Sequence, residues 1–413
     1  MQKLLVIGAV WPEPQTTAAG VHMMQLLKAF QQEGYDILFT SIATKTPYSV
    51  DLHEHAIQTK CITLNDPSFD NLITELQPDI VLFDRFMTEE QFGWRVAENA
   101  PEALRILNTE DLHSLRETRA MLSKKQLPFE LDAWLAGKKT LRELASIYRS
   151  DLTLVLSTYE MGLLEQRIGI PSAYVSHCPF LIPERGATNT PSLGFHGRKD
   201  FVTFGNGRHL PNTDALHYLK DALWPMIRKQ LPGANLHVFG AYLPQSIQNM
   251  HDDTQGFLVK GWIADLEAVV AASKVVLAPL RFGAGIKGKL ALAMQCGTPS
   301  VTTPIGAEGM VDKESWSGQI GNTPEALVAA AVALYQSESQ WISAQQRGFE
   351  ILADRFPEKE IQKRLFHQIR TIRQNLRTHR LANTMGRILQ QEAYASTKFM
   401  GRWIEEKNRG NKG

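Results

Sequence analysis

The chain has 413 residues, of which 43% are hydrophobic and 21% are charged, and its formal net charge at pH 7 is +1. This length predicts two domains of ordinary globular composition, and the near-neutral charge argues against a general nucleic-acid-binding surface. The three scattered cysteines favour a reduced, cytoplasmic environment, and no apolar stretch approaches the roughly 20 residues that cross a bilayer.

The chain alternates short apolar runs with amphipathic stretches. We expect a helix at 20–30, and strands at 4–9, 35–40, 80–83, 104–107, 152–156, 201–204, 236–239, 257–259, 275–278 and 300–302. Continuous apolar strands separated by helices are typical of a parallel sheet covered on both faces. The sequence therefore predicts an α/β protein with two doubly wound domains around a cleft, in which ligands bind beyond the carboxyl ends of the strands.

Composition also suggests where the domains end. We place the first domain at 1–185, a Pro-, Gly- and Ser-rich linker at 186–199, the second domain at 200–360 and basic C-terminal helices at 361–413. From Glu360 onward, twelve Lys or Arg stand against four Glu, a net charge of +8. Two interpretations of this tail stay open. It can cross back onto the first domain, or it can offer a basic amphipathic helix with Trp403 as an anchor to an anionic membrane.

The most informative segment is 279–310, PLRFGAGIKGKLALAMQCGTPSVTTPIGAEGM. Gly283 and Gly285 form a turn before a helix that begins near Lys287. Glycines let a backbone approach a ligand closely, and the helix start supplies unpaired N–H groups. Lys287 and Lys289 would oppose the helix dipole unless an anion were bound there. The segment therefore predicts a phosphate site.

Two further loops have the same character. The loop at 11–20 ends in small residues at a helix start and is longer than usual for a strand–helix connection. It predicts an anion site at Gly20, or else a plain connection capped by Thr17. The second loop holds Gly205 and Arg208 before another helix. Arg208 is either a ligand for a diphosphate or an ordinary surface residue.

Acidic and basic groups gather after the strand at 104–107. Asp111 and His113 would face the cleft; alternatively Asp111 caps a helix whose Arg116 and Arg119 are solvated. After the strand at 152–156, the spacing of Ser157 and Glu160 matches a capping box, for which we expect a structural role.

The segment around Lys289 resembles the donor-binding signature of GT-B glycosyltransferases of family 4, which are retaining enzymes that use a nucleotide sugar. Lys289-Leu-Ala-Leu292-Ala-Met-Gln-Cys-Gly297 is similar to the family's Lys-Val-Leu-Glu-Ala-Met-Ala-Cys-Gly. Leu292 stands where the family has a Glu that binds the donor ribose, and Ala284 replaces an earlier family Glu. Gly261-Trp262 is similar to a segment that meets the nucleobase, although Trp262 can equally pack in the core.

The resemblance implies a GT-B fold whose C-terminal helices cross back to the first domain, and a hexosyl transfer of the kind used in polysaccharide biosynthesis. It implies that Asp111 and His113 position the sugar and handle protons. Glu308 is our candidate to replace the missing ribose carboxylate. The expected nucleotide-sugar-binding residues are Gly20, Gly205, Arg208, Trp262, Gly283, Gly285, Ile286, Lys287, Lys289 and Glu308.

The expected partners are a nucleotide diphosphate sugar as co-substrate and a glycan or lipid-linked acceptor, with no nucleic acid. Because the chain has no Asp-x-Asp triplet and no metal-like His or Cys spacing, we expect no metal and no cofactor. The expected location is the cytoplasm, with possible peripheral contact with the inner membrane. Two alternatives stay open: a catalytically inactive GT-B-like binding protein that lost its ribose Glu at Leu292, and another GT-B activity such as a nucleotide-sugar epimerase.

Overall fold

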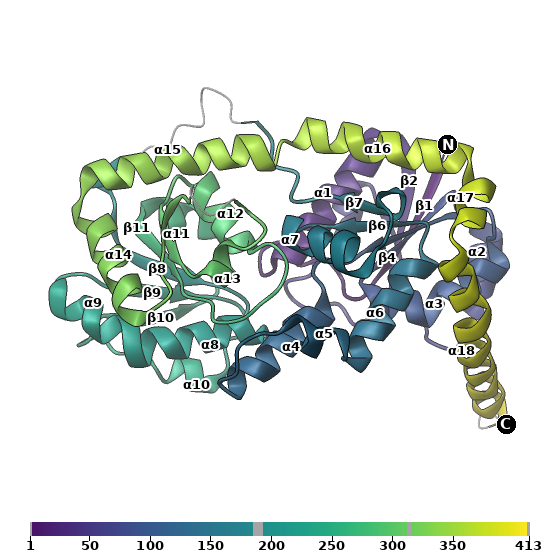
Figure 1. The fold of residues 1–413 in the computed structure, drawn as a ribbon, viewed down its shortest axis with the longest axis horizontal. Coiled ribbons are helices and arrows are strands. Elements are labelled where there is room, and N and C mark those ends of the chain that lie inside the picture. Colours follow the sequence, from purple (N-terminus) through teal and green to yellow (C-terminus); the bar gives the residue numbers. More distant parts are fainter. Residues whose placement is uncertain (1, 185–192, 312–315, 411–413) are drawn as a thin grey trace.

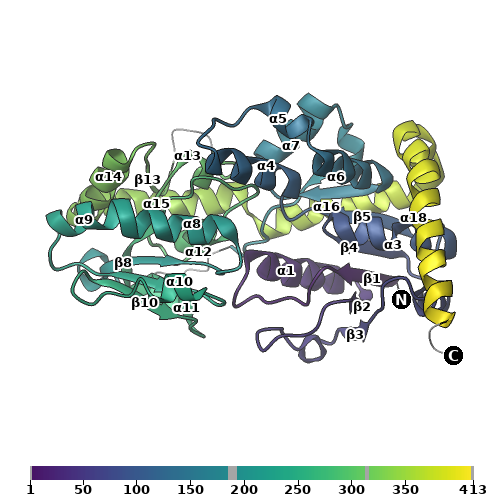
Figure 2. The same cartoon turned by 90° about the horizontal axis from the view of Figure 1, so that it is seen from below.

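The computed structural model describes residues 2–184, 193–311 and 316–410, without the side chains of 392–395 and 408–410. Two sheets, each with neighbouring strands parallel, lie side by side in the molecule (Figures 1 and 2). The first sheet has the order β3-β2-β1-β4-β5-β6-β7 and the second has the order β10-β9-β8-β11-β12-β13. In each sheet the order reverses beside its first strand, which is where ligands bind in doubly wound folds.

The strands are as follows: β1 (Gln2–Gly8), β2 (Tyr35–Ser41), β3 (Gln58–Cys61), β4 (Ile80–Asp84), β5 (Leu104–Asn108), β6 (Leu152–Val155), β7 (Val175–His177), β8 (Lys199–Phe204), β9 (Leu236–Phe239), β10 (Phe257–Gly261), β11 (Ser273–Ala278), β12 (Ser300–Thr302) and β13 (Gly318–Ile320). Sequence analysis missed β3, β7 and β13. These strands are short, and β3 at the sheet edge is largely exposed, so it lacks the apolar run that marks a buried strand.

The helices of the first domain are α1 (Ala18–Gln32), α2 (Ser68–Leu76), α3 (Phe86–Asn99), α4 (His113–Lys124), α5 (Leu131–Leu135), α6 (Lys138–Arg149) and α7 (Thr158–Gly162). Those of the second are α8 (Leu210–Tyr218), α9 (Trp224–Gln230), α10 (Gln245–Gln248), α11 (Leu266–Ala272), α12 (Gly288–Gln295), α13 (Pro304–Ala307), α14 (Pro324–Gln336) and α15 (Glu338–Arg355). The C-terminal helices are α16 (Glu358–Gln374), α17 (Leu376–Ala382) and α18 (Thr384–Gly410).

Each sheet is buried on both faces because successive side chains of a strand point to opposite sides. In β1, Leu4 and Val6 join a cluster with α1 and α16, whereas Leu5 and Ile7 join a cluster with α2, α3 and α6. The second sheet likewise packs against α9 and α14 on one face and against α11 and α12 on the other. This arrangement confirms the predicted α/β class with two Rossmann-like domains.

The chain returns to the first domain through α16, which lies across that domain beside α1 (Figure 1). The outgoing and returning segments touch where they cross. The Ile182 N–H donates to the Phe356 carbonyl at 3.1 Å, and the Glu358 N–H donates to the Ile182 carbonyl at 3.2 Å. The predicted crossing of the C-terminal helices is therefore confirmed. The predicted domain limits stay predictions, and linker residues 186–192 lie outside the described residues.

The first prediction concerns this crossing. Phe366 of α16 is buried and packs edge-to-face on Phe30 of α1, with the ring centroids 5.0 Å apart. We expect Phe366→Ala to lower the free energy of unfolding by about 3–5 kcal/mol in urea denaturation, with Lys363→Ala on the exposed face of α16 as the control. A double-mutant cycle with Phe30→Ala should give a coupling of about 0.5–1.5 kcal/mol. A coupling near zero would contradict this packing.

Candidate interdomain site

The carboxyl edges of the two sheets face each other, and this brings together the starts of two helices from different domains. Thr17 caps α1, accepting a hydrogen bond from the Gly20 N–H at 3.0 Å. Gly288 opens α12 against this point, since a Cβ added to Gly288 would lie 2.4 Å from the Cβ of Ala18. Each helix start has a positive dipole end, so their meeting favours an anion.

Gly20 lies within this junction. An added Cβ would lie 2.5 Å from the Glu13 carbonyl carbon, so only glycine allows the 11–17 loop to fold over the start of α1. The Glu13 carboxylate accepts hydrogen bonds from Thr16 at 2.7 Å, from Thr46 at 2.6 Å and from the Tyr242 hydroxyl of the second domain at 3.1 Å. The long loop therefore contributes to the contact between the domains.

The glycine turn after β11 is closed by the first domain. Gly285 has φ of 65°, and its N–H donates to the Glu160 carboxylate at 2.8 Å. A Cβ on Gly285 would lie 2.7 Å from the Cβ of Asp111. The sequence predicted that these amides face a phosphate; in this arrangement a carboxylate of the chain accepts from the Gly285 amide instead. Ile286, also expected to bind the nucleotide sugar, is buried in a cluster with Phe180 between the domains.

Glu160 is a residue whose role sequence analysis misassigned. The capping-box prediction was wrong, because Ser157 makes no side-chain cap and Glu160 accepts from the Gly285 and Leu112 amides. Burial raises the pKa of Glu160 to about 8, with Asp111 adding to the effect. Spacing alone could not reveal this contact, because Gly285 is 125 residues away.

The two lysines of the glycine-rich segment both lie at the junction. Lys287 is buried, and its ammonium donates to the Gly285 carbonyl at 2.7 Å. Burial lowers the pKa of Lys287 to about 8, although Glu308 opposes the shift. Lys289 donates to the Asn212 side chain at 2.8 Å, and Asn212 packs directly against Gly205. Gly205 and Lys289, predicted from separate motifs, are thus neighbours through Asn212.

Arg119 of α4 forms a two-pronged ion pair with Glu308, across the interface between the domains. Its two terminal nitrogens lie 2.6 and 2.8 Å from the Glu308 oxygens, and Nη1 also donates to the Gly283 carbonyl at 2.8 Å. Both oxygens of the carboxylate that we expected to bind a sugar hydroxyl are therefore engaged by Arg119. The pair is bidentate and largely buried, so it joins the two domains more strongly than a surface ion pair would.

Asp111 and His113 come together as the sequence predicted. His113 Nε2 lies 3.3 Å from Asp111 Oδ1, and Arg116 donates to the other carboxylate oxygen. Burial disfavours a charge on Asp111, but Arg116 and His113 outweigh it and lower the pKa of Asp111 to about 2. Burial lowers the pKa of His113 to about 4. At neutral pH the pair is therefore a carboxylate beside a neutral imidazole, which can orient hydroxyl groups and accept a proton.

Arg208 and Trp262 lie at another part of the interface. The exposed Arg208 guanidinium stacks on the Tyr242 ring, 3.7 Å from its centroid. Trp262 is 39% exposed and contacts the Tyr48 ring of the first domain, with centroids 5.3 Å apart. Both residues border the space between the domains, so Trp262 is not a core residue of the second domain alone.

Leu292 is partly buried on α12 and packs against an apolar cluster that includes Val202, Phe204 and Phe239.

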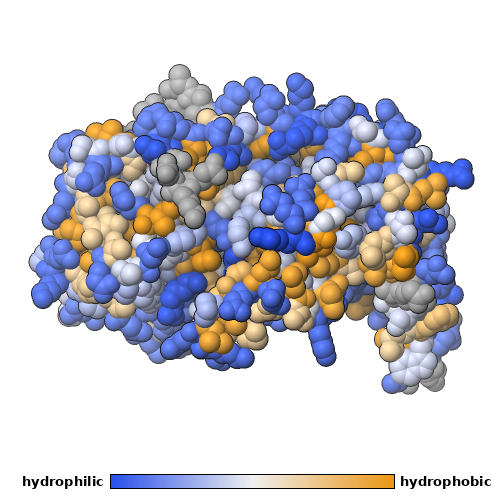
Figure 3. Space-filling model, in the orientation of Figure 1, coloured by the Kyte–Doolittle hydropathy of each residue, from blue (hydrophilic) through white to orange (hydrophobic). Residues whose placement is uncertain are grey.

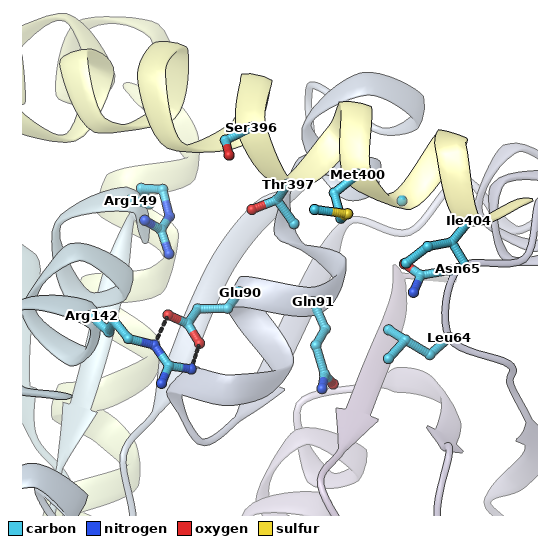
Figure 4. Close-up of a pocket in the computed structure, with 11 residues that line it drawn as sticks. Leu64, Asn65, Glu90, Gln91, Arg142, Arg149, Ser396, Thr397, Met400 and Ile404 are labelled. Carbon is cyan, nitrogen blue, oxygen red and sulfur yellow. Dashed lines mark hydrogen bonds and ion pairs between the residues drawn. The ribbon is translucent and has the colours of Figure 1, made fainter. Parts of the chain in front are cut away.

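Two hollows lie away from this interface. One of about 440 Å³ is lined by α18, α3 and α6 (Figure 4), and one of about 520 Å³ is lined by β13 and α15. Neither contains the residues described above. Among the described residues, no group of three His, Cys, Asp or Glu side chains could hold a metal ion. Within the same ranges, no helix is long and apolar enough to cross a membrane.

Comparisons with known proteins bear on the fold of both domains and on the sequence of the second. Residues 198–337 match the model of the family described as Glycosyl transferases group 1. Sucrose-phosphate synthase from Thermosynechococcus elongatus aligns with a TM-score of 0.66 and 16% identity over 90% of this chain and 99% of that chain. HepE from Anabaena, in complex with UDP and glucose, aligns with a TM-score of 0.66 and 13% identity over 89% and 99%.

A glycosyltransferase from Rickettsia africae aligns with a TM-score of 0.63 and 9% identity over 89% of this chain and 97% of that chain. No curated protein matches the sequence. About nine-tenths of the chain therefore aligns with proteins of the GT-B fold, and its second domain carries the glycosyltransferase group 1 sequence pattern.

The second prediction concerns Glu160. Its pKa rises from 4.5 to about 8 on folding. Between these pH values the folded chain keeps a proton that the unfolded chain has released, so this residue makes stability fall as pH rises. Glu160→Gln can still accept from both amides and removes the titration. We expect the unfolding free energy of the variant, relative to wild type, to rise by about 2 kcal/mol or more from pH 5 to pH 8 in urea titrations. Parallel pH profiles would contradict the assignment.

Proposed function

We propose that this protein is a glycosyltransferase that moves a hexose-type unit from a nucleotide diphosphate sugar to a glycan or lipid-linked acceptor. The observation that carries the proposal is the meeting of the α1 and α12 starts, with Lys287 and Lys289 beside them, between the facing carboxyl edges of a GT-B fold. The family match at 198–337 and the UDP and glucose bound to HepE support a nucleotide sugar as the ligand.

The diphosphate is placed near the α12 start, where amides and cationic side chains neutralise it without a metal ion or other cofactor. Lys289 and Arg208 are the candidate phosphate ligands of the second domain. Trp262 borders the same side and is a candidate contact for the base. Charge grows on the leaving diphosphate as its bond to the sugar breaks, so fixed positive groups there lower the barrier.

Asp111 and His113 belong to the first domain and are proposed to position the sugar and the acceptor. The acceptor oxygen forms a bond to the anomeric carbon while the bond from that carbon to the diphosphate oxygen breaks. The acceptor proton passes to the leaving diphosphate, and transfer occurs with retention of configuration. With pKa values of about 2 and 4, Asp111 is a carboxylate and His113 a neutral imidazole at working pH, so both can orient hydroxyl groups.

Donor entry requires the chain's own contacts to rearrange. Glu160 accepts from the Gly285 amide, and Arg119 holds both oxygens of Glu308. A diphosphate could replace the Glu160 carboxylate at the turn, and a sugar or ribose hydroxyl could then reach Glu308. Opening and closing of the two domains is a common route to such an exchange, and closure excludes water that would hydrolyse the donor.

The second candidate is a GT-B-like binding protein without turnover. It is favoured by Leu292, whose packing against Phe204 and Phe239 leaves no carboxylate at that position of α12. It is also favoured by the internal pairing of Glu160 and Glu308. The two candidates share a nucleotide site, so turnover is the property that separates them.

The third prediction tests the nucleotide site. We expect calorimetry to detect binding of one nucleoside diphosphate, and Arg208→Ala to weaken that binding by about 1.5–3 kcal/mol while leaving the corresponding nucleoside nearly unaffected. Arg347→Ala on α15, which lines the hollow at β13, is the matched control. Equal losses for both ligands would refute a phosphate contact, and no binding by any nucleotide would refute the function itself.

The fourth prediction tests turnover. Nucleotide release from a panel of donor sugars, with and without acceptor glycans, should identify one active donor. We expect Asp111→Asn, which removes the charge that positions the sugar and the acceptor, to lower the transfer rate by about 100-fold. Asp36→Asn, at an exposed position of β2, is the control. Tight nucleotide binding by wild type with no turnover on any donor would favour the inactive binding protein.

A further inference from the structure

In the long C-terminal helix α18, the described residues that contact the first domain lie on one side. Gly386 lies against the Tyr148 carbonyl, and Gly401 lies against Trp94 and Asn65, so the backbone approaches the first domain closely at two points. Gln390, between them, donates to the Arg149 carbonyl at 3.1 Å. These positions recur at spacings of four and eleven residues and therefore share one face of the helix.

The contacts on this inner face are mainly polar. Ion pairs join Arg95 to Glu405 and Glu98 to both Lys398 and Arg402. Between α18 and the body lies the hollow of Figure 4, where the Arg142–Glu90 ion pair and the side chain of Met400 are seen. Among the described residues, no α18 side chain belongs to the five apolar clusters of the protein. Apolar packing therefore does not explain the apolar residues of this helix.

Those apolar residues gather on the opposite side. Met385, Ile388, Phe399 and Trp403 are spaced by three, eleven and four residues, which places them in one stripe along the helix. All are at least half exposed, and Phe399 and Trp403 reach 69% and 60%. Figure 1 shows α18 running past the end of the first domain, and Figure 3 shows apolar surface along it. An apolar stripe of this length in water indicates a partner.

Basic side chains flank this stripe. Arg387 lies on one side of it and Lys407 on the other, and both are exposed. Arg402, also exposed, lies on the same side as Arg387 and is paired with Glu98 at 3.4 Å. Glu406 is the exposed acidic residue near the C-terminal end. Over 384–410, the residues of α18, five Lys or Arg stand against three Glu, a net charge of +2. A second copy of this helix would bring like charges together, whereas an anionic surface would neutralise them.

We propose that the outer face of α18, defined by Met385, Ile388, Phe399 and Trp403, docks on an anionic lipid bilayer. The helix lies in the plane of the membrane, with its aromatic side chains in the headgroup region and its basic side chains against lipid phosphates. The first domain is thereby held at the surface. This docking is independent of the transfer reaction, because α18 contains none of the interdomain residues.

The test is co-sedimentation of the full-length protein with vesicles of phosphatidylglycerol and phosphatidylcholine, or of phosphatidylcholine alone. We expect binding to the first kind, and at least about tenfold weaker binding to neutral vesicles or in high salt. Phe399→Ser with Trp403→Ser should weaken binding by about tenfold or more. Ile342→Ser, at a 51% exposed position of α15, is the matched control and should bind as wild type does.

Two further measurements keep the result interpretable. Thermal unfolding of each variant shows whether the fold is intact. Trp403→Phe should fold and bind but lose much of the blue shift in tryptophan fluorescence that anionic vesicles cause.

The proposal is overturned if the wild-type protein does not bind anionic vesicles, or if a folded Phe399→Ser, Trp403→Ser protein binds them as wild type does. It is also overturned if Leu127→Ser with Leu141→Ser, at exposed apolar positions after α4 and in α6, abolishes binding instead. A concentration-dependent dimer lost only in the α18 variant, without vesicle binding, would assign the stripe to a second copy.

Discussion

The constraint on which the site depends is the opposed orientation of two parallel sheets, whose carboxyl edges face each other across one interface. Every loop singled out by its glycines or charges lies on one of those edges, and the starts of α1 and α12 meet there. Two positive helix ends and two lysines require negative charge nearby. In this arrangement the Asp111 and Glu308 carboxylates supply it, and Glu160, whose raised pKa leaves it mostly protonated at neutral pH, accepts from the Gly285 amide.

The chemistry proposed for the site requires the donor to replace hydrogen bonds and ion pairs that the chain makes with itself. A diphosphate competes with Glu160 for the Gly285 amide, and hydroxyl groups compete with Arg119 for Glu308. A buried carboxyl whose pKa lies near 8 is a weaker competitor than a fully charged phosphate, because it is mostly protonated at neutral pH. The arrangement is therefore compatible with a donor that binds by replacing these internal contacts. In a binding protein without turnover, the same contacts would keep the two domains together.

Much of the fold could be predicted from the sequence because continuous apolar strands between amphipathic helices allow few arrangements. The approximate positions of the long strands, the two-domain architecture and the return of the C-terminal helices to the first domain were predicted correctly. The joining of Asp111 with His113 could also be predicted, because both follow one strand by a few residues. The roles of Glu160, Arg119 and Tyr242 could not, because each contacts a residue of the other domain more than 120 positions away.

The sequence alone determined the periodicity, the glycine turns and the charge of the tail, all of which are local properties of neighbouring residues. The tertiary structure decided which groups meet: that Gly285 faces a carboxyl group, that Glu308 is held by Arg119, and that Phe399 and Trp403 of α18 are exposed. Local sequence patterns indicate the burial and backbone conformation of each segment. The contacts between these side chains depend instead on how the two domains and α18 pack together, which joins residues far apart in sequence.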